Sequence, residues 1–207
     1  DNREFNFSAI NNRAAIKATG EYLLFLNDDT EVINSDWLTE MVRIAEQERV
    51  GAVGAKLWYP DYTLQHGGII LGIKGVAGHA HKHFDKLNQG YLGRANLIQE
   101  FSAVTGACML VKKELFTSVG GFDENLTIAY NDIDLCLKIK ELGFKIVWTP
   151  YAELIHHESK SRGDDFQTEK FERLKKESEY LLNRWGDIIQ NDPAYSPNLT
   201  LETENFG

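Results

Sequence analysis

The segment Asn27-Asp28-Asp29 directly follows an uninterrupted apolar run, Tyr22 to Leu26. The run has the length and composition of a strand that is buried on both faces of a parallel sheet. In open α/β sheets, ligands bind beyond the carboxyl ends of the strands, where these aspartates would stand. Adjacent carboxylates repel each other, so a divalent cation that also holds a phosphorylated substrate would stabilise them. The alternative is an ordinary strand-end turn, in which Asp and Asn are common.

A second group of polar, mostly acidic residues follows the paired glycines 120 and 121. It comprises Asp123, Glu124, Asn131, Asp132 and Asp134. Asp132 falls in the first turn of an expected helix, where the helix dipole favours an ionised carboxylate. Such a carboxylate can remove the proton of an acceptor hydroxyl. Asp134 is two positions further on and does not share the same helix face, so at most one of the two faces a substrate. Simple capping of the helix is the alternative explanation.

Two groups of histidines are candidates for binding metal or phosphate. His156 and His157 follow an expected strand over residues 152–155, and Arg162 adds a strong phosphate donor nearby. A surface histidine without chemistry is the alternative there. His79, His81 and His83 would share one face of an extended segment, which is a zinc-like spacing. Because the neighbouring residues include few apolar ones that could bury this segment, a solvated loop is favoured over a zinc site.

The elements that must position these residues alternate between helix and strand. Helices are expected over 11–18, from a cap at residue 35 or 36 to a point before Gly51, and over 112–119, 131–142 and 166–185. Strands are expected over 22–26, 52–57, 103–111, 145–149 and 152–155. This alternation is typical of an α/β sheet. The last helix carries an apolar stripe formed by Phe171, Leu174, Ser178, Leu181 and Trp185. The chain opens on the polar residues DNREFNFS, so the first strands of such a sheet are expected to be missing.

Composition limits the classes of function. The chain has 207 residues, 43% of them hydrophobic, which suffices for one domain with a sizeable core. A net charge of −9 argues against a nucleic-acid partner, which needs a basic face. Cys108 and Cys136 lie in apolar runs and are expected to be buried free thiols, which fits a reducing, cytoplasmic compartment. No apolar run approaches the roughly 20 residues of a membrane span.

In their order and spacing, these segments resemble family 2 glycosyltransferases of the GT-A fold, especially the rhamnosyltransferase-like enzymes of bacterial polysaccharide and O-antigen assembly. The matching segments are Asn12 with GEYLLFLNDDTEV, then HGGIILG, TGACMLVKKELFTSVGGFDE and NDIDLCLKIKELGFKIVWTPYAELIHHESKSRG. The resemblance implies a Rossmann-related α/β fold with a mixed, mostly parallel sheet flanked by helices, lacking its first strands. Residues 1–163 would form the metal and acceptor half of the domain, with a helix and tail over 164–207 packing on it.

The resemblance also implies roles for particular residues. Asn27-Asp28-Asp29 occupies the place of the family's DxD motif, so metal binding would rest on Asp29, with Asp28 and His156 beside it. Asp132 occupies the place of the catalytic base in the family's ED motif. The implied donor-binding residues are Asn27, Asn12 and Arg162, and the implied acceptor side comprises Gly106, Asp123, Asn131 and Asp134.

Together these features predict an inverting, metal-dependent glycosyltransferase that acts in cell-surface polysaccharide synthesis. Its cofactor would be Mg²⁺ or Mn²⁺, and its substrates a nucleotide sugar and a glycan or lipid-linked acceptor. Its expected place is the cytoplasm, either free or peripheral at the inner face of the membrane. Other domains of a longer polypeptide are expected partners. The main alternative is a non-catalytic module that keeps the fold to bind or assemble glycans, and a hydrolase built on the three histidines near residue 81 is a weaker one.

Overall fold

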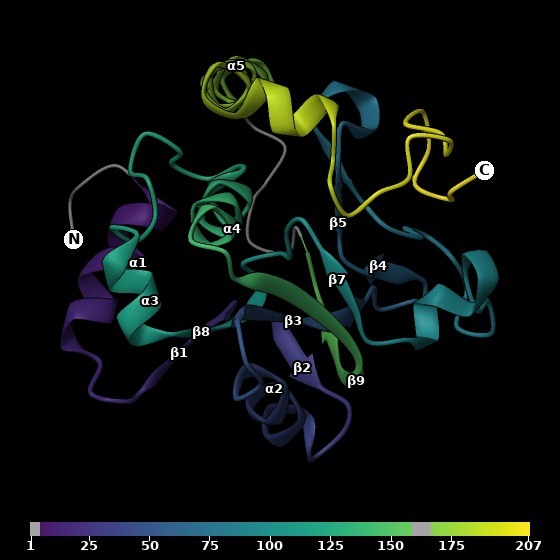
Figure 1. Ribbon diagram of the computed structural model, residues 1–207, viewed down its shortest axis with the longest axis horizontal. Helices are drawn as coiled ribbons and strands as arrows, with labels where there is room; N and C mark the ends of the chain where they lie inside the picture. Colours follow the sequence, from purple (N-terminus) through teal and green to yellow (C-terminus); the bar gives the residue numbers. More distant parts are fainter. Residues whose placement is uncertain (1–4, 159–166) are drawn as a thin grey trace.

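The computed structural model describes residues 5–158 and 167–207, which form one central sheet with helices on both sides (Figure 1). Within these residues the main sheet has seven strands, in the order β1-β8-β3-β9-β2, with β4 added to β3 and β7 added to β9. The strands are β1 (Tyr22–Leu26), β2 (Thr30–Val32), β3 (Val50–Trp58), β4 (Leu64–His66), β7 (Gln99–Phe101), β8 (Cys108–Lys112) and β9 (Lys145–His156). A separate hairpin pairs β5 (Ile69–Leu71) with β6 (Ala77–His79).

The direction of the strands determines where a site can form. β3 and β9 are parallel, whereas β8 is antiparallel to both β1 and β3. It follows that β1, β3 and β9 all run the same way and end at one edge of the sheet. The predicted mixed α/β sheet is therefore confirmed, and among the described ladders only the β3–β9 pair is itself parallel.

Two strands differ from their sequence-based expectation. In β1, Leu23 and Phe25 are buried, but Tyr22 and Leu24 on the other face are only partly buried and the last residue, Leu26, is 43% exposed. The reason is its position, since β1 is an outermost strand of the described sheet and has β8 as its one described neighbour. The fully buried strand is instead β3, at the centre.

The second difference concerns β9, which was expected as two strands interrupted at Pro150 and is one strand over residues 145–156. The pairing with β3 jumps from Trp148 to Glu153, so the intervening residues bulge out of the ladder. Proline is tolerated at such a bulge because it has no N–H to donate to a neighbouring strand. The bulge therefore lets β9 continue to its end at His156.

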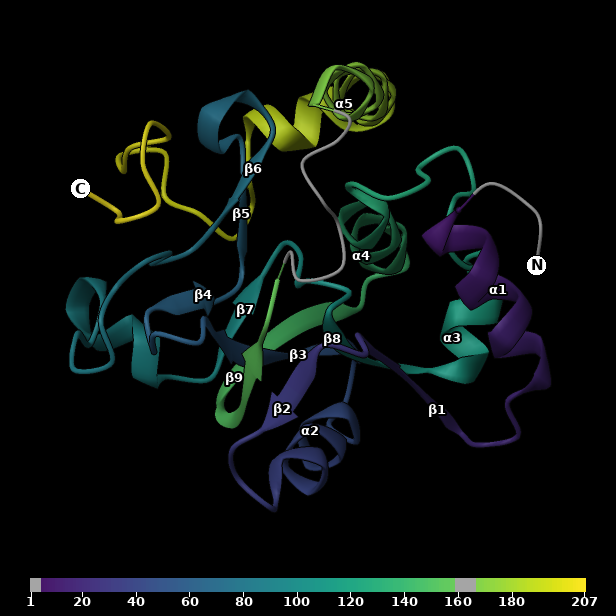
Figure 2. The same cartoon turned by 180° about the vertical axis from the view of Figure 1, so that it is seen from behind.

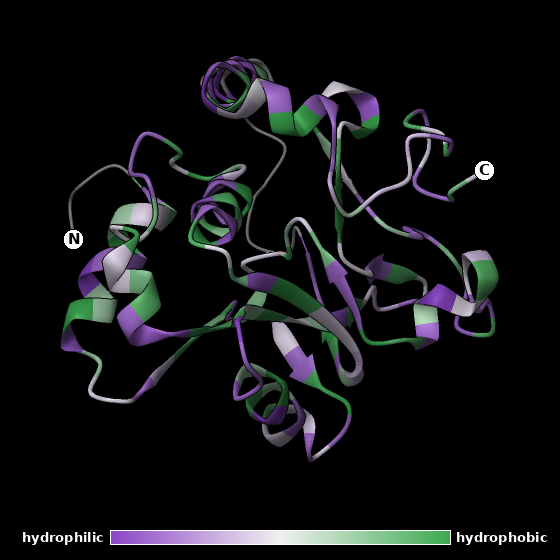
Figure 3. Cartoon of the chain, viewed as in Figure 1, coloured by the Kyte–Doolittle hydropathy of each residue, from purple (hydrophilic) through white to green (hydrophobic). Residues whose placement is uncertain are grey.

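The helices form layers on the sheet. They are α1 (Phe7–Lys17), α2 (Trp37–Ala45), α3 (Lys113–Ser118), α4 (Asn131–Glu141) and α5 (Gln167–Gln190), with short 3-10 turns η1 (Ile73–Gly75) and η2 (Tyr91–Asn96). Figures 1 and 2 show α2 on one side of the sheet and α4 and α5 on the other, with α1 and α3 beside β1 and β8. In Figure 3, α2 and α4 carry both hydrophilic and hydrophobic stretches, as amphipathic helices on a core do.

The cores on the two sides of the sheet have different compositions. On the α2 side, Met41 and Ile44 pack with Val53, Leu110 and Leu154 of the strands. The larger cluster, on the α4 side, includes the aromatic residues Phe25, Phe101, Phe116, Phe122 and Trp148. Cys108 and Cys136 are buried free thiols, as predicted.

The buried stripe of α5 is shorter than the expected one. Phe171 and Leu174 are 68% and 41% exposed, whereas Leu181 and Trp185 are buried. The first turns of the described helix therefore extend beyond the part that packs on the domain. None of the described helices has the length and apolar character needed to cross a membrane.

Gly54 in β3 lets another segment cross the sheet at close range. A Cβ atom at this position would lie 2.5 Å from Cβ of Val104, which belongs to the segment leading to the strand ends. Residue 54 must therefore lack a side chain for the two segments to pack. This close packing allows residues 103–107 to lie directly on the sheet.

We expect Gly54→Ala to destabilise the protein by about 1–3 kcal/mol, because the added methyl group overpacks this crossing. The matched control is Gly186→Ala in α5, where an added Cβ would meet nothing within 4 Å. That change should stabilise the protein by about 0.5–1 kcal/mol, since alanine is the better helix residue. Thermal or urea unfolding measures both, and equal stability of the two variants would contradict the packing argument.

Candidate active site

The two strand ends predicted to carry chemistry meet at one edge of the sheet. β2 follows the Asn27-Asp28-Asp29 turn and pairs with the end of β9, so that Thr30 lies opposite His156. A backbone hydrogen bond from His157 N to Asp29 O, 2.9 Å long, closes the contact. As a result, Asp29 Oδ1 lies 3.0 Å from Nε2 of His156.

The His156 ring is oriented by groups behind it. Its Nδ1 lies 2.7 Å from Oε1 of Gln65, while the amide nitrogen of Gln65 contacts the oxygens of His156 and Glu158. Because Gln65 Oε1 can only accept, Nδ1 carries the proton in the neutral ring. The lone pair of Nε2 then faces Asn27 Nδ2, at 3.2 Å, and Asp29. Metal-binding histidines are commonly held in this way by a second partner.

The Asp29–His156 pair has features that suit a cation. Asp29 Oδ1 is buried and accepts no hydrogen bond from the described residues. Adjacent ligands of an octahedral ion with bonds near 2.1 Å lie about 3 Å apart, similar to the separation of these two atoms. Asp28 is exposed. Within residues 5–158 and 167–207, no group of three or more His, Cys, Asp or Glu side chains could hold a metal ion.

Asp132 stands at the start of α4, beside the same edge. Its Oδ2 accepts a 2.9 Å hydrogen bond from the backbone N–H of Gly106, and its Oδ1 accepts one of 2.9 Å from Ile133. Burial raises the pKa of Asp132, and the backbone hydrogen bonds from Gly106 and Ile133 oppose the rise. A carboxylate with a raised pKa is a stronger base than an exposed one.

The turn formed by residues 105–107 joins these groups. Ala107 O accepts a 3.0 Å hydrogen bond from the backbone N–H of Asn27. Gly106 binds Asp132, and the N–H of Thr105 lies 3.4 Å from Nε2 of His66. One short turn therefore links the end of β1, the start of α4 and the end of β4.

Several predicted site residues make their contacts elsewhere. Asn12 in α1 exchanges two 2.9 Å hydrogen bonds with the backbone of Phe122. Asp134 is fully buried, accepts a 2.8 Å hydrogen bond from Trp185 of α5 and pairs with Lys138 and Arg184. These contacts tie helices and loops together.

Two further candidates, Asp123 and Asn131, lie on the same loop and helix as Asp132. Asp123 accepts hydrogen bonds from Tyr180 and Arg184 of α5, at 2.8 and 3.0 Å. Asn131 is buried and donates to Ile128 O at 3.0 Å. Arg162, a predicted donor-binding residue, lies outside the described residues.

The three histidines with strand-like spacing do not face one another. His81 and His83 have positive φ angles, so the segment turns. His81 is buried and stacks on Phe206, whereas His83 stacks on Tyr59. The expectation of a solvated loop is therefore wrong for His81. The chain reverses direction at His81 and His83, and the C-terminal tail packs over His81.

Sequence reasoning missed Gln65 and His66, which lie beside the site. Their signal was present in the sequence QHGG, where two polar residues precede paired glycines. A Cβ on Gly68 would lie 2.3 Å from the Phe101 ring, so this glycine is needed for the hairpin to pack.

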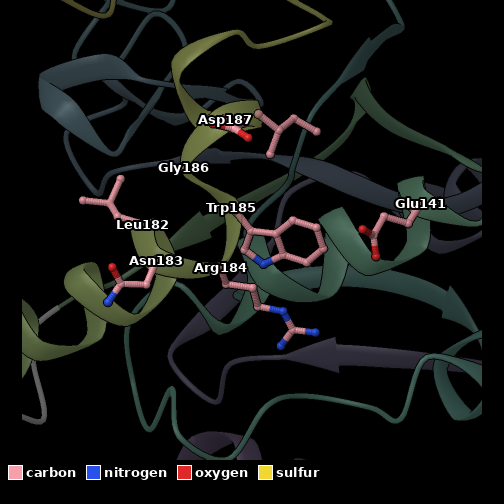
Figure 4. A pocket seen from close by; sticks show the side chains of 8 residues that line it. Glu141, Leu182, Asn183, Arg184, Trp185, Gly186 and Asp187 are labelled. Atoms are coloured by element: carbon pink, nitrogen blue, oxygen red, sulfur yellow. The ribbon is translucent and has the colours of Figure 1, made fainter.

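A pocket of about 350 Å³ lies away from these strand ends, between α4 and α5 (Figure 4). Its lining comprises Glu141 and residues 182–188, and Figure 4 shows Trp185 and Arg184 projecting toward α4. None of the predicted site residues lines it. The chemistry-bearing residues therefore mark the candidate site better than this cavity does.

The comparisons with known proteins agree with this arrangement. The sequence profile of the family described as glycosyltransferase like family 2 matches residues 6–187. A solved mannosyltransferase from Pyrobaculum calidifontis, in complex with GDP-Man and Mn²⁺, has a TM-score of 0.58 over 94% of this chain and 47% of its own, at 16% identity. The fold is thus that of GT-A glycosyltransferases. The chain belongs to glycosyltransferase family 2, and it is a glycosyltransferase domain.

Two curated relatives match almost the whole chain. The O-antigen biosynthesis protein RfbC of Myxococcus xanthus is 41% identical over 98% of this chain, which corresponds to 16% of that protein. An uncharacterised protein, y4gI, of Sinorhizobium fredii is 50% identical over the whole chain and 23% of its own length. The chain therefore spans less than a quarter of the length of these relatives.

A buried carboxylate on α5 holds the loop that precedes Asp132. Glu177, which is 3% exposed, accepts hydrogen bonds from the backbone N–H groups of residues 127, 128 and 129, at 2.7, 3.1 and 2.9 Å. The hydroxyl of Thr127 adds a fourth at 2.5 Å. The carboxylate thus satisfies three consecutive backbone donors just before α4 begins.

We expect Glu177→Gln to cost about 1–3 kcal/mol of stability, because the amide nitrogen cannot accept from these donors. Glu179→Gln is the control, since its pairing with Lys175 at 3.9 Å is exposed. That substitution should cost less than about 0.5 kcal/mol. Chemical unfolding measures both, and hydrogen exchange at residues 127–129 should rise only in the Glu177 variant. Unchanged exchange there would contradict the role of Glu177.

Proposed function

We propose that this domain catalyses metal-dependent transfer of a sugar, with inversion, from a nucleotide sugar to a hydroxyl group of a glycan or lipid-linked acceptor in cell-surface polysaccharide synthesis. The observation that carries the proposal is the connection of Asp29, His156 and Asp132 through one edge of the sheet and one turn. The relative named for O-antigen biosynthesis supports the polysaccharide context.

Asp132 is the proposed general base. Its carboxylate is fixed by the N–H groups of Gly106 and Ile133, which leave lone pairs on both oxygens. As the acceptor oxygen attacks the anomeric carbon, Asp132 takes the hydroxyl proton and the bond to the diphosphate breaks. A single displacement of this kind inverts the anomeric centre.

Asp29 and His156 are the proposed protein ligands of a divalent ion. The buried Oδ1 of Asp29, which accepts no hydrogen bond from the described residues, lies 3.0 Å from Nε2 of His156, whose other ring nitrogen is held by Gln65. When bound, such an ion would neutralise the departing diphosphate. Gln65 holds the His156 ring in the tautomer that this requires. The mannosyltransferase solved with GDP-Man and Mn²⁺ supports a cation by fold analogy.

Replacing Asp132 by Asn tests the base. We expect kcat of the full-length protein to fall about 10²–10⁴-fold, because the amide cannot take the proton. Since burial raises the pKa of Asp132, wild-type kcat should rise with pH through a value above that of an ordinary aspartate and then level off. Glu141→Gln, at the far end of α4, is the control for folding and activity. Near-normal transfer by the Asp132 variant would remove it as the base.

Replacing Asp29 by Asn tests the metal site. Isothermal titration with Mn²⁺ in the presence of pyrophosphate should show at least a roughly tenfold loss of affinity, because a charged ligand becomes neutral. Asp28→Asn removes the same charge from an exposed neighbour, so a smaller loss is expected. Equal affinity of the Asp29 variant and the wild type would place the cation elsewhere.

A further inference from the structure

Two histidines beside the proposed metal ligands form a direct pair. His66 ends β4 and His79 ends β6, and their Nδ1 atoms lie 2.8 Å apart. The rings meet edge to face, with centroids 5.0 Å apart at 81°. His66 is fully buried, whereas His79 is partly exposed. The outward side of the pair is therefore His79.

The backbone fixes where the protons of this pair reside. Burial lowers the pKa of His66 well below its ordinary value and that of His79 to about 4, so both rings are neutral at pH 7. The N–H of Thr105 can only donate, so His66 Nε2 is the acceptor. His66 must then carry its proton on Nδ1 and donate it to Nδ1 of His79. His79 is left with its proton on Nε2.

The N–H of His79 Nε2 can donate to an oxygen of a ligand, and a lysine side chain lies nearby. Lys82 lowers the pKa of His79 and therefore places a positive charge near it, while Glu204 raises that pKa. Gln65, which contacts the ring of His156, directly precedes His66 in the chain, so the pair lies near the Asp29–His156 edge. No hydrogen bond is recorded for His79 Nε2 among the described residues. Among the described residues this N–H therefore has no acceptor, and the ammonium group of Lys82 lies in the same region.

We propose that Nε2–H of His79 donates a hydrogen bond to a non-bridging oxygen of the substrate diphosphate, with Thr105 fixing the required tautomer through His66. This inference rests on the proposed function, because the diphosphate is held there by Asp29 and His156. His79 thereby becomes a binding residue for the leaving group. The turn that positions Asp132 also orients His79, so both ends of the reaction depend on residues 105–107.

The tautomers are tested in the wild-type chain by imidazole ¹⁵N NMR at pH 7. The expected result is a proton on Nδ1 of His66 and on Nε2 of His79. Adding Mg²⁺ and pyrophosphate should move the His79 Nε2–H proton downfield and slow its exchange with water. A proton on Nδ1 of His79, or saturation with pyrophosphate without any change at Nε2–H, would overturn the proposal.

Two amide substitutions separate the two ring nitrogens. His79→Gln places an amide N–H near the position of Nε2, whereas His79→Asn places its amide near Nδ1 and removes the outward donor. We expect pyrophosphate affinity, measured with Mg²⁺, to fall about tenfold in the Asn variant and less than about threefold in the Gln variant. Circular dichroism and thermal unfolding show whether both variants fold.

The outcomes distinguish this inference from the function on which it rests. If Asp29→Asn weakens pyrophosphate binding and the two His79 variants bind alike, the role of His79 is overturned and the proposed function stands. If Asp29→Asn leaves binding unchanged, the diphosphate is not held at this edge and both fall.

Discussion

The candidate site depends on the hydrogen bonds made by the backbone of three residues, Thr105, Gly106 and Ala107. Each of them contacts a different polar element: His66 at the end of β4, Asp132 at the start of α4 and Asn27 at the end of β1. Backbone groups are held more rigidly than long side chains, so the distances between these elements are fixed before any substrate binds. Gly54 makes this possible, since it lets Val104 pass close over β3.

A second layer of contacts supports this turn from outside. Glu177 satisfies the three backbone N–H groups before α4, and Asp134 joins α4 to Trp185 and Arg184 of α5. Both carboxylates are buried, where their hydrogen bonds are stronger than they would be in water. The last helix thus helps to fix the position of Asp132.

Local patterns in the sequence were sufficient for much of the fold. The strand at residues 22–26 and the helix that begins at Asn131 are close to the expected ones. The glycines at 120 and 121 adopt positive φ angles, as a turn requires. The first two candidate groups, around Asp29 and Asp132, could be found because acidic residues follow a strand or begin a helix. Pro150 was misleading, since a proline ends a strand only where its missing N–H is needed for pairing.

By itself, the sequence determined which residues carry chemistry and which segments become helices and strands, because these properties depend on side-chain type and on neighbours a few positions away. Only the tertiary structure decided that His156 faces Asp29, that His66 meets His79, and that Asp134 turns toward Trp185 instead of a substrate. Such pairings join residues far apart in the chain. They follow from strand order and from how closely segments cross, which no local periodicity specifies.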